Sequence, residues 1–249
     1  MTHVRARPVV VEAVRPAEPC AICEARPFSV CNAIDARDLE RLSALAVYLT
    51  VDAGRTFIEE GDPAECFFNV TAGTAKLFKL LPDGRRQITG FASMGTFLGL
   101  AVSSTYAFGA EALEPTRICR FSRPKLRELL DDFPAMEKRL LEVASNELVA
   151  AQEQMLLLGR KTARERLASF LVARAGCLCN GVASCGRPAE KVMLPMTRSD
   201  IADYLGLTIE TVSRTLTKLR GDKLIDIPVP SQIVLRNPAA LQSLASGLH

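Results

Sequence analysis

Three cysteines near the N-terminus have the spacing of metal ligands. Cys20 and Cys23 form a Cys-x2-Cys pair, and Cys31 follows shortly after them. Such a pair lets two thiolates converge on one metal from a single turn, and both zinc and an iron–sulfur cluster fit this spacing. The alternative is three unligated thiols in a flexible arm. A further ligand must come from elsewhere, and the lone Cys119 is a candidate, although a cysteine in a strand is usually a small core residue.

The other cysteines have weaker patterns. Cys177, Cys179 and Cys185 lie in a segment whose Gly, Asn and Pro content predicts a loop. They could hold a second metal, but neither a fourth cysteine nor a histidine lies beside them. We interpret them as exposed thiols in a hairpin insertion.

A second stretch, residues 197–219, carries groups that could read DNA. Thr197 and Asp200 resemble a capping box, Ala202 is small where two helices would cross, Gly206 makes a turn, and Thr208 caps a second helix. This order predicts a helix-turn-helix.

The second helix of this motif has one apolar and one polar face. Its apolar stripe is Val212, Leu216 and Leu219. Glu210 and Arg214 are one turn apart on the outer face, where they could form a simple surface ion pair. In the major groove, Arg can instead bond guanine while Glu accepts from the paired cytosine. With the positive charge of this region, we expect DNA binding by Glu210, Ser213, Arg214, Thr197, Arg198, Thr208, Thr211 and Lys218.

One long helix is predicted between these two regions. Residues 135–158 contain neither Pro nor interior Gly and are rich in helix formers. Apolar residues recur at alternating spacings of three and four, which is typical either of packing within one domain or of a dimer seam. The chain has a net charge of −3 up to Gly159 and +6 after it, so this helix is placed to couple two unlike halves. We favour a dimer seam made by Leu141, Ala144, Leu148, Ala151, Met155 and Leu158.

The remaining elements would position these residues. Turn residues at regular intervals between Val51 and Ser122 predict a small all-β barrel or roll. Further helices and a wing are expected. The predicted segments are helices at Ile34–Leu49, Lys125–Leu130 and Thr162–Ala173, strands at Phe57–Ile58, Phe67–Val70, Ala75–Leu81, Gln87–Phe91 and Arg117–Phe121, and a β-hairpin wing from Lys223 to Arg236.

Composition narrows the class of protein. The 249 residues allow two domains, and 48% apolar with 24% charged residues is ordinary for a globular chain. No apolar run could span a membrane, and the N-terminus lacks the apolar core of a signal peptide, so we expect a cytoplasmic protein. The only histidines are His3 and His249, and we find no catalytic triad, paired catalytic carboxylates or phosphate-binding Gly loop. We therefore do not expect an enzyme.

The motifs together resemble the CRP/FNR superfamily of bacterial transcription regulators over nearly the whole chain. Gly61-Asp62-Pro63, Phe67 to Gly73 and Thr197 to Leu219 match its β-roll and helix-turn-helix in order and spacing. Glu210-Thr-Val-Ser213-Arg214 looks like the E-x-x-S-R reading head of FNR-type proteins. Leu156-Leu-Leu and Ala163-Arg-Glu-Arg-Leu167 are similar to the exit of their dimer helix.

The resemblance implies an α+β fold with four parts. These are an N-terminal arm with the cysteines (1–33), a β-roll sensor domain (34–133), a dimerisation helix (134–160) and a winged helix-turn-helix (161–249). Cys20, Cys23, Cys31 and Cys119 sit where FNR-like oxygen sensors place their cluster ligands. The resemblance therefore implies an oxygen-labile [4Fe–4S] cluster that promotes dimerisation and DNA binding, with the Cys23–Cys31 gap closer to that of FnrN-type sensors.

The resemblance also implies binding partners and a DNA site. The expected partners are a second copy of the chain, RNA polymerase and double-stranded DNA carrying a TTGAT-N4-ATCAA-like palindrome. Cyclic-nucleotide sensors hold their ligand with a Gly-Glu and an Arg-Ser/Thr pair, which the region Met94–Tyr106 lacks, so we expect no cyclic nucleotide. The competing hypothesis is a zinc-stabilised regulator or interaction module that responds to another signal.

Overall fold

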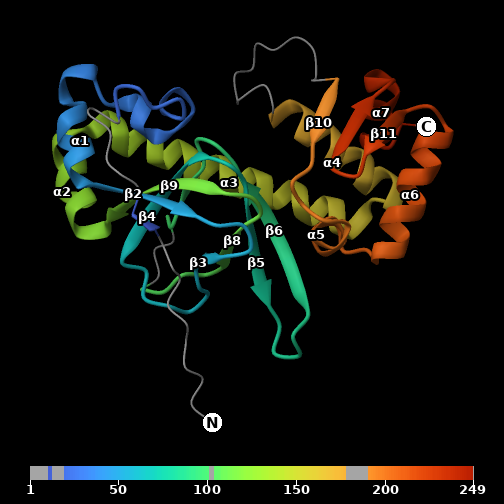
Figure 1. The fold of residues 1–249 in the computed structure, drawn as a ribbon, viewed down its shortest axis with the longest axis horizontal. Helices are drawn as coiled ribbons and strands as arrows, with labels where there is room; N and C mark the ends of the chain where they lie inside the picture. The colour runs from blue at the N-terminus through green and yellow to red at the C-terminus, as the bar shows by residue number, and fades with distance from the viewer. Residues whose placement is uncertain (1–10, 13–19, 101–103, 178–189, 249) are drawn as a thin grey trace. The chain divides into compact units, whose positions relative to one another are not determined.

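The computed structural model describes residues 11–12, 20–100, 104–177 and 190–248 (Figure 1). The chain divides into two compact units, Met1–Glu147 and Leu148–His249, and the long helix α3 (Pro134–Arg160) runs through the boundary. None of the helices in the described ranges is long and apolar enough to cross a membrane.

The N-terminal unit contains two antiparallel sheets. One has the strand order β1-β2-β9-β4-β7 and the other β3-β8-β5-β6. The strands are β1 (Val11–Glu12), β2 (Ala46–Val51), β3 (Thr56–Ile58), β4 (Cys66–Ala72), β5 (Ala75–Leu80), β6 (Arg86–Ala92), β7 (Phe97–Leu98), β8 (Gly109–Ala112) and β9 (Thr116–Ser122).

Short helices flank these strands. The segment before β2 contains 3-10 helices η1 (Arg26–Phe28), η2 (Val30–Ala33) and η3 (Ala36–Asp38), followed by α1 (Leu39–Leu45). After β9 come α2 (Arg123–Asp132) and α3. Successive strand residues face opposite sides of a sheet, so β4 and β9 contribute to two apolar cores. Phe67 and Phe121 lie in one core with α1, α2 and the start of α3, whereas Phe68 and Ile118 lie in the other.

The C-terminal unit is a small helical domain with one sheet. Its elements after α3 are α4 (Ala163–Cys177), β10 (Lys191–Met193), α5 (Arg198–Leu205), α6 (Ile209–Gly221), β11 (Ile225–Val229), β12 (Gln232–Leu235) and α7 (Pro238–Ala245). The strands pair in the order β10-β12-β11. The fully buried Leu167, Leu171, Ile201 and Leu205 form the interior of the described part of this unit.

The predicted α+β class, β-roll, long helix, helix-turn-helix and wing are confirmed. The predicted helix Ile34–Leu49 is wrong in its second part, because α1 ends at Leu45 and Ala46–Val51 is strand β2. Strands β7, β8 and β10 and helix α7 were not predicted. Gly176 and Cys177, which were predicted to lie in a loop, are the last residues of α4, and the rest of the predicted loop up to Pro188 lies outside the described residues. Cys179 and Cys185 lie outside the described residues.

Candidate cysteine site and nucleic-acid interface

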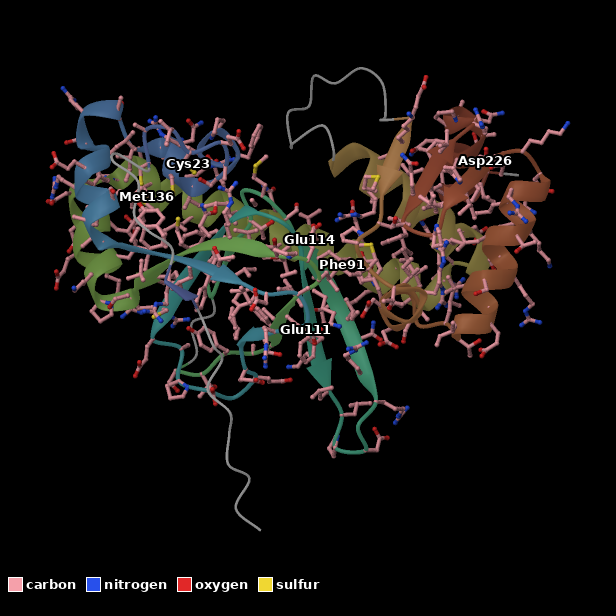
Figure 2. All side chains as sticks on the ribbon, viewed as in Figure 1. Cys23, Phe91, Glu111, Glu114, Met136 and Asp226 are labelled. Carbon is pink, nitrogen blue, oxygen red and sulfur yellow. The ribbon has the colours of Figure 1, made fainter. Side chains whose placement is uncertain are left out.

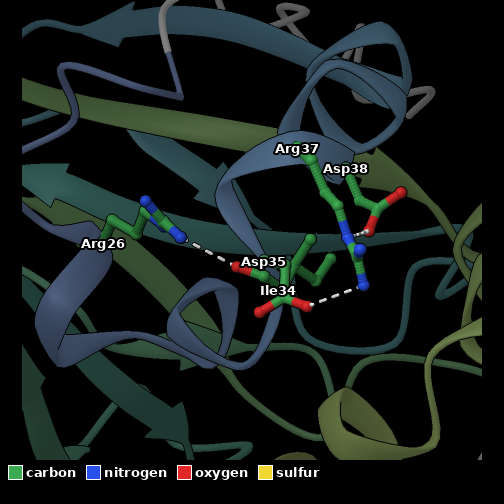
Figure 3. A network of polar contacts seen from close by, with 5 residues as sticks. All are labelled: Arg26, Ile34, Asp35, Arg37 and Asp38. Carbon is green, nitrogen blue, oxygen red and sulfur yellow. Dashed lines mark hydrogen bonds and ion pairs between the residues drawn. The ribbon is translucent and has the colours of Figure 1, made fainter.

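Tight turns hold the segment that carries the first three cysteines. The Arg26 backbone N–H donates to the Cys23 carbonyl at 3.1 Å, and the Cys31 N–H donates to the Ser29 hydroxyl at 3.2 Å. The Arg26 side chain donates to the Ile34 carbonyl at 2.8 Å and so links the residues before and after Cys31 (Figure 3). The turns and the arginine thus fix the backbone on both sides of Cys31.

This segment packs closely on the β-roll. Gly95 has φ +90°, and a Cβ there would lie 2.7 Å from the Cβ of Phe28. Only glycine tolerates both that backbone conformation and that approach. Gly95 therefore lets the cysteine-bearing segment lie against the sheet that contains Cys119.

The structure brings the four predicted ligands into one neighbourhood. Cys31 and Cys119 are buried in the same core, and Cys20 packs against it. The pKa of Cys31 is raised to about 11: burial is the main cause, the Ser29 hydroxyl opposes it, and the charges of Cys20 and Cys23 add smaller increases. Burial also raises the pKa of Cys119, with contributions from the other three thiols. Each buried thiol thus lies within electrostatic reach of its neighbours.

The donor set can be compared with the two metal groups. Across the described ranges, no group of three or more His, Cys, Asp and Glu side chains is arranged to hold a single metal ion. A mononuclear zinc site needs its sulfurs to converge at about 2.3 Å from one point. A polynuclear cluster binds each cysteine at a different iron, so its ligands stand further apart. Thiolates are ligands of both groups, so the chemistry of the four neighbouring thiols suits either zinc or an iron–sulfur cluster.

The core beneath the cysteines reaches the long helix. Met136 and Leu140, in the first turns of α3, are buried in the same core as Cys31 and Cys119. Figure 2 labels Cys23 and Met136 within this unit. The packing of the cysteine segment and that of the start of α3 therefore depend on each other.

Most residues of the predicted dimer seam are exposed in the single chain. Leu141, Leu148 and Met155 are 69%, 61% and 64% exposed, and Ala144 and Ala151 are also exposed. Leu158 differs, because it is half-buried and its side chain lies beside Gly206 of its own unit. The exposed apolar residues of α3 are available to a partner helix, whereas Leu158 is shared with its own domain.

The predicted capping box is present at the start of α5. The Asp200 carboxylate accepts from the Thr197 N–H at 2.9 Å and from the Thr197 hydroxyl at 2.6 Å, while the Asp200 N–H donates to Thr197 Oγ1 at 3.1 Å. Gly206 then adopts φ +60° and ends the helix. These local interactions set the start and end of the first helix of the motif.

Helix α6 presents the predicted reading face. Val212, Leu216 and Leu219 are buried. Glu210, Ser213, Arg214 and Lys218 are exposed, and Thr211 is half-exposed.

Two of the predicted contact residues lie at the N-terminal ends of the two helices of the motif. Thr208 caps α6 by accepting from the Thr211 N–H at 3.2 Å. Arg198, at the start of α5, donates to the Pro230 carbonyl in the wing at 3.3 Å. Arg198 therefore ties the first helix of the motif to the wing.

Glu210 is held as a carboxylate at the start of α6. Its own backbone N–H and the Thr208 hydroxyl lower the pKa of Glu210, and the positive charge of Arg214 lowers it further. Glu210 and Arg214 are both exposed on this helix, so both side chains are accessible to a partner.

Two residues near these sites were not singled out from the sequence. The hydroxyl oxygen of Tyr48 lies 3.3 Å from the sulfur of Cys20. No sequence signal marked this tyrosine. Arg166 donates to the carbonyls of Leu158, Lys161, Leu205 and Gly206, at the ends of α3 and α5. Its position within the segment similar to an FNR-type helix exit was the only available signal.

The β-roll, the long helix and the capped helix-turn-helix with its wing define a DNA-binding transcription regulator. Residues 165–244 match the Crp-like helix-turn-helix domain, and residues 48–133 match the cyclic nucleotide-binding domain. The chain belongs to the CRP/FNR family of transcription regulators.

Relatives support this assignment over almost the full length. The chain is 41% identical to the nitrogen fixation regulation protein FixK of Bradyrhizobium diazoefficiens, covering 91% of this chain and 94% of FixK. It is 37% identical to the transcriptional activator protein FnrL of Cereibacter sphaeroides, covering 89% and 90%. The solved structure of FixK2 from Bradyrhizobium japonicum superposes with a TM-score of 0.73 at 37% identity, covering 80% of this chain and 96% of that one. These relatives are regulators and not enzymes.

Proposed function

We propose that this protein is an oxygen-responsive transcriptional activator whose cysteine site controls DNA binding. The observation that carries the proposal is the shared core: Cys31 and Cys119 are buried with Met136 and Leu140 of α3. A [4Fe–4S] cluster held by Cys20, Cys23, Cys31 and Cys119 would supply an oxygen-sensitive centre with thiolate ligands. The similarity to the activator FnrL supports the assignment as an activator.

The chain's own residues connect this site to dimerisation. Four thiolates bound to a cluster would be held in one place and would constrain the segment over the β-roll. That segment shares its core with the start of α3. Ordering the first turns of α3 would align the exposed apolar residues further along the helix. In the proposed dimer, Leu141, Ala144, Leu148, Ala151 and Met155 face a second copy of the chain, with Leu158 at the edge of the seam.

The proposed DNA site is a palindrome of the TTGAT-N4-ATCAA type. A two-fold dimer presents two α6 helices, so the half-sites lie about one helical turn apart. In each half-site, Arg214 bonds the guanine, Glu210 accepts from the paired cytosine and steers Arg214, and Ser213 contacts a neighbouring thymine. The exposed, ionised face of α6 supports this reading. RNA polymerase is the expected protein partner, and we expect no cyclic nucleotide to be required.

Spectra of anaerobically purified protein test the metal group. We expect a brown protein whose visible absorbance bleaches in air, with iron and sulfide in the ratio of a cubane cluster. A colourless, air-indifferent protein that contains zinc would support the zinc-stabilised alternative and contradict oxygen sensing.

Single substitutions test the ligand set. We expect Cys20→Ser, Cys23→Ser, Cys31→Ser and Cys119→Ser each to reduce iron per chain, because each iron of a cubane needs a thiolate or a substitute. Cys66→Ser is the matched control, since Cys66 is also half-buried in the same unit but lies outside the set. Full iron loading in Cys119→Ser would move the fourth ligand elsewhere, and loss of iron in Cys185→Ser would place it in the second cysteine group.

A further inference from the structure

A row of side chains on the sheet beneath the cysteines contains two polar residues. Tyr48 of β2 and Asn69 of β4 are each in register with Cys119 of β9. Residues paired across antiparallel strands point to the same face, with Cβ atoms about 4.5–5.5 Å apart. Tyr48, Cys119 and Asn69 therefore form one row, here called the Cys119 row, on the sheet face that carries the thiol site.

Asn69 has no evident structural use in this row. It is 2% exposed, and its side-chain oxygen has no hydrogen-bond partner among the residues that the structure describes. Asn69 pairs with Phe97 of the neighbouring strand β7. Phe67, two residues earlier in β4, lies on the same face of the sheet. A buried amide oxygen without a partner destabilises a fold, and an apolar side chain of similar size would avoid that cost. The described part of the polypeptide therefore leaves this oxygen without a partner.

The amide of Asn69 can present a donor at this place. Turning the amide through half a turn exchanges its oxygen and nitrogen, so the same buried corner can hold an N–H group. A thiolate sulfur accepts hydrogen bonds and has no proton to give. Cys119, the direct cross-strand neighbour of Asn69, is such a sulfur once it acts as a ligand.

Tyr48 repeats this arrangement on the other side of Cys119. Its hydroxyl lies 3.3 Å from the sulfur of Cys20 and 3.3 Å from the hydroxyl of Ser43. Toward a thiolate, the phenol can only donate. The row thus places a donor on each side of Cys119, and one of them already contacts a second predicted ligand.

We propose that Asn69 and Tyr48 are positioning residues for the cysteine ligands and donate hydrogen bonds to the ligand sulfurs when the metal group is bound. The inference rests on the proposed function. Partners in the outer shell of a metal site orient its ligands and tune its electronic properties. Hydrogen bonds to the sulfurs are among the terms that set the reduction potential of iron–sulfur centres. Loss of a donor should shift that potential to a more negative value and make oxidation easier.

The experiment compares Asn69→Leu and Tyr48→Phe with wild type in the full-length chain. Thr71→Val is the matched control, because it removes a hydroxyl from the same strand β4 that bonds only the Arg117 carbonyl, at 3.1 Å. Each protein is purified without oxygen, and its iron content, midpoint potential and rate of bleaching in air are measured. The melting temperature of each iron-free protein is measured separately.

The proposal predicts opposite effects of Asn69→Leu on the two forms. The iron-free variant should melt at a higher temperature than wild type, because the unpartnered amide is gone. The loaded variant should have a more negative potential and should bleach faster, by roughly tenfold. Tyr48→Phe should also shift the potential and the rate in these directions, and it keeps the test open if Asn69→Leu does not fold. Thr71→Val should match wild type in potential and rate.

The results separate this inference from the proposed function. If wild type carries iron but both variants keep its potential and its bleaching rate, the positioning role is wrong and the oxygen-sensing proposal stands. If wild type carries no iron, the proposed function fails and the inference fails with it. A shift of equal size in Thr71→Val would show that any loss of polarity in β4 has this effect, and would also overturn the specific role.

Discussion

Arg166 joins the end of the long helix to the helix-turn-helix. Its guanidinium donates to the carbonyls of Leu158 and Lys161 at 2.8 Å each, and to those of Leu205 and Gly206 at 2.9 and 3.4 Å. Carbonyls at the ends of helices lack intrahelical partners, and a cation there also interacts favourably with the helix dipole. One side chain therefore satisfies the C-terminal ends of both α3 and α5.

The expected energetic cost of losing Arg166 follows from these contacts. A hydrogen bond that involves a charged group contributes about 1.5–3 kcal/mol. Three of the four contacts have normal hydrogen-bond lengths, but the side chain is half-buried, so water can replace part of what is lost. We expect Arg166→Met, which keeps an unbranched stem but removes the guanidinium, to lower the free energy of unfolding by about 2–4 kcal/mol. Arg166→Lys should lower the free energy of unfolding by less, because the ammonium keeps the positive charge. Some loss should remain, since the ammonium cannot reach both helix ends.

Urea unfolding followed by far-ultraviolet circular dichroism measures this cost. Arg164→Met is the matched control: Arg164 lies two positions earlier in α4 and forms an exposed ion pair with Asp222, a type of contact worth about 0–1 kcal/mol. DNA affinity is measured in parallel. Since Arg166 is not one of the predicted base-reading residues, its loss should weaken binding to the palindrome and to unrelated DNA alike. Equal stabilities of Arg166→Met and Arg164→Met would refute the reasoning.

Two further predictions concern DNA reading and dimerisation. Glu210→Ala should leave non-specific DNA affinity equal or higher while the preference for G·C at the third half-site position relaxes by about 1–3 kcal/mol, because a carboxylate near phosphates is useful only if it reads a base. Competition binding checks this, and unchanged discrimination would remove Glu210 from base reading. Glu153→Ala should raise the dimer fraction of air-treated protein in sedimentation, because like charges near a two-fold axis oppose association. An unchanged fraction would show that Glu153 does not control the dimer.

The helix-turn-helix was predictable because its signals are local. Thr197 and Asp200 are three residues apart and form the expected capping box. Gly206 takes the left-handed conformation that ends α5, and the spacing of Val212 and Leu216 on α6 identifies the buried face. Each of these features depends on residues within one or two turns of chain. Sequence patterns report such short-range interactions well.

Several elements lacked local signals or gave conflicting ones. Leu42, Leu45 and Leu49 fit a helical period, but strand β2 begins at Ala46. Both faces of its sheet contact apolar cores, so the sequence of β2 lacks the alternation of apolar and polar residues that is typical of a strand. Strand β8 begins with Gly109, a weak strand former, against which the ring of Phe78 packs so closely that a Cβ would lie 2.7 Å away. Tertiary packing decides the structure at both places.

The cysteine site shows the same division between local and distant information. The spacing of Cys20, Cys23 and Cys31 predicts a metal motif without a structure, whereas Cys119 was only a candidate ligand until the resemblance to a family placed it in the set. The polar residues beside Cys119 could not be found in either way. Tyr48 and Asn69 become its neighbours only through the register of β2 and β4 against β9, and a shift of one residue would turn each to the other face. Under the proposed function, strand register determines which donors meet the ligand sulfurs, so the β-roll as well as the cysteine motif would control the metal chemistry.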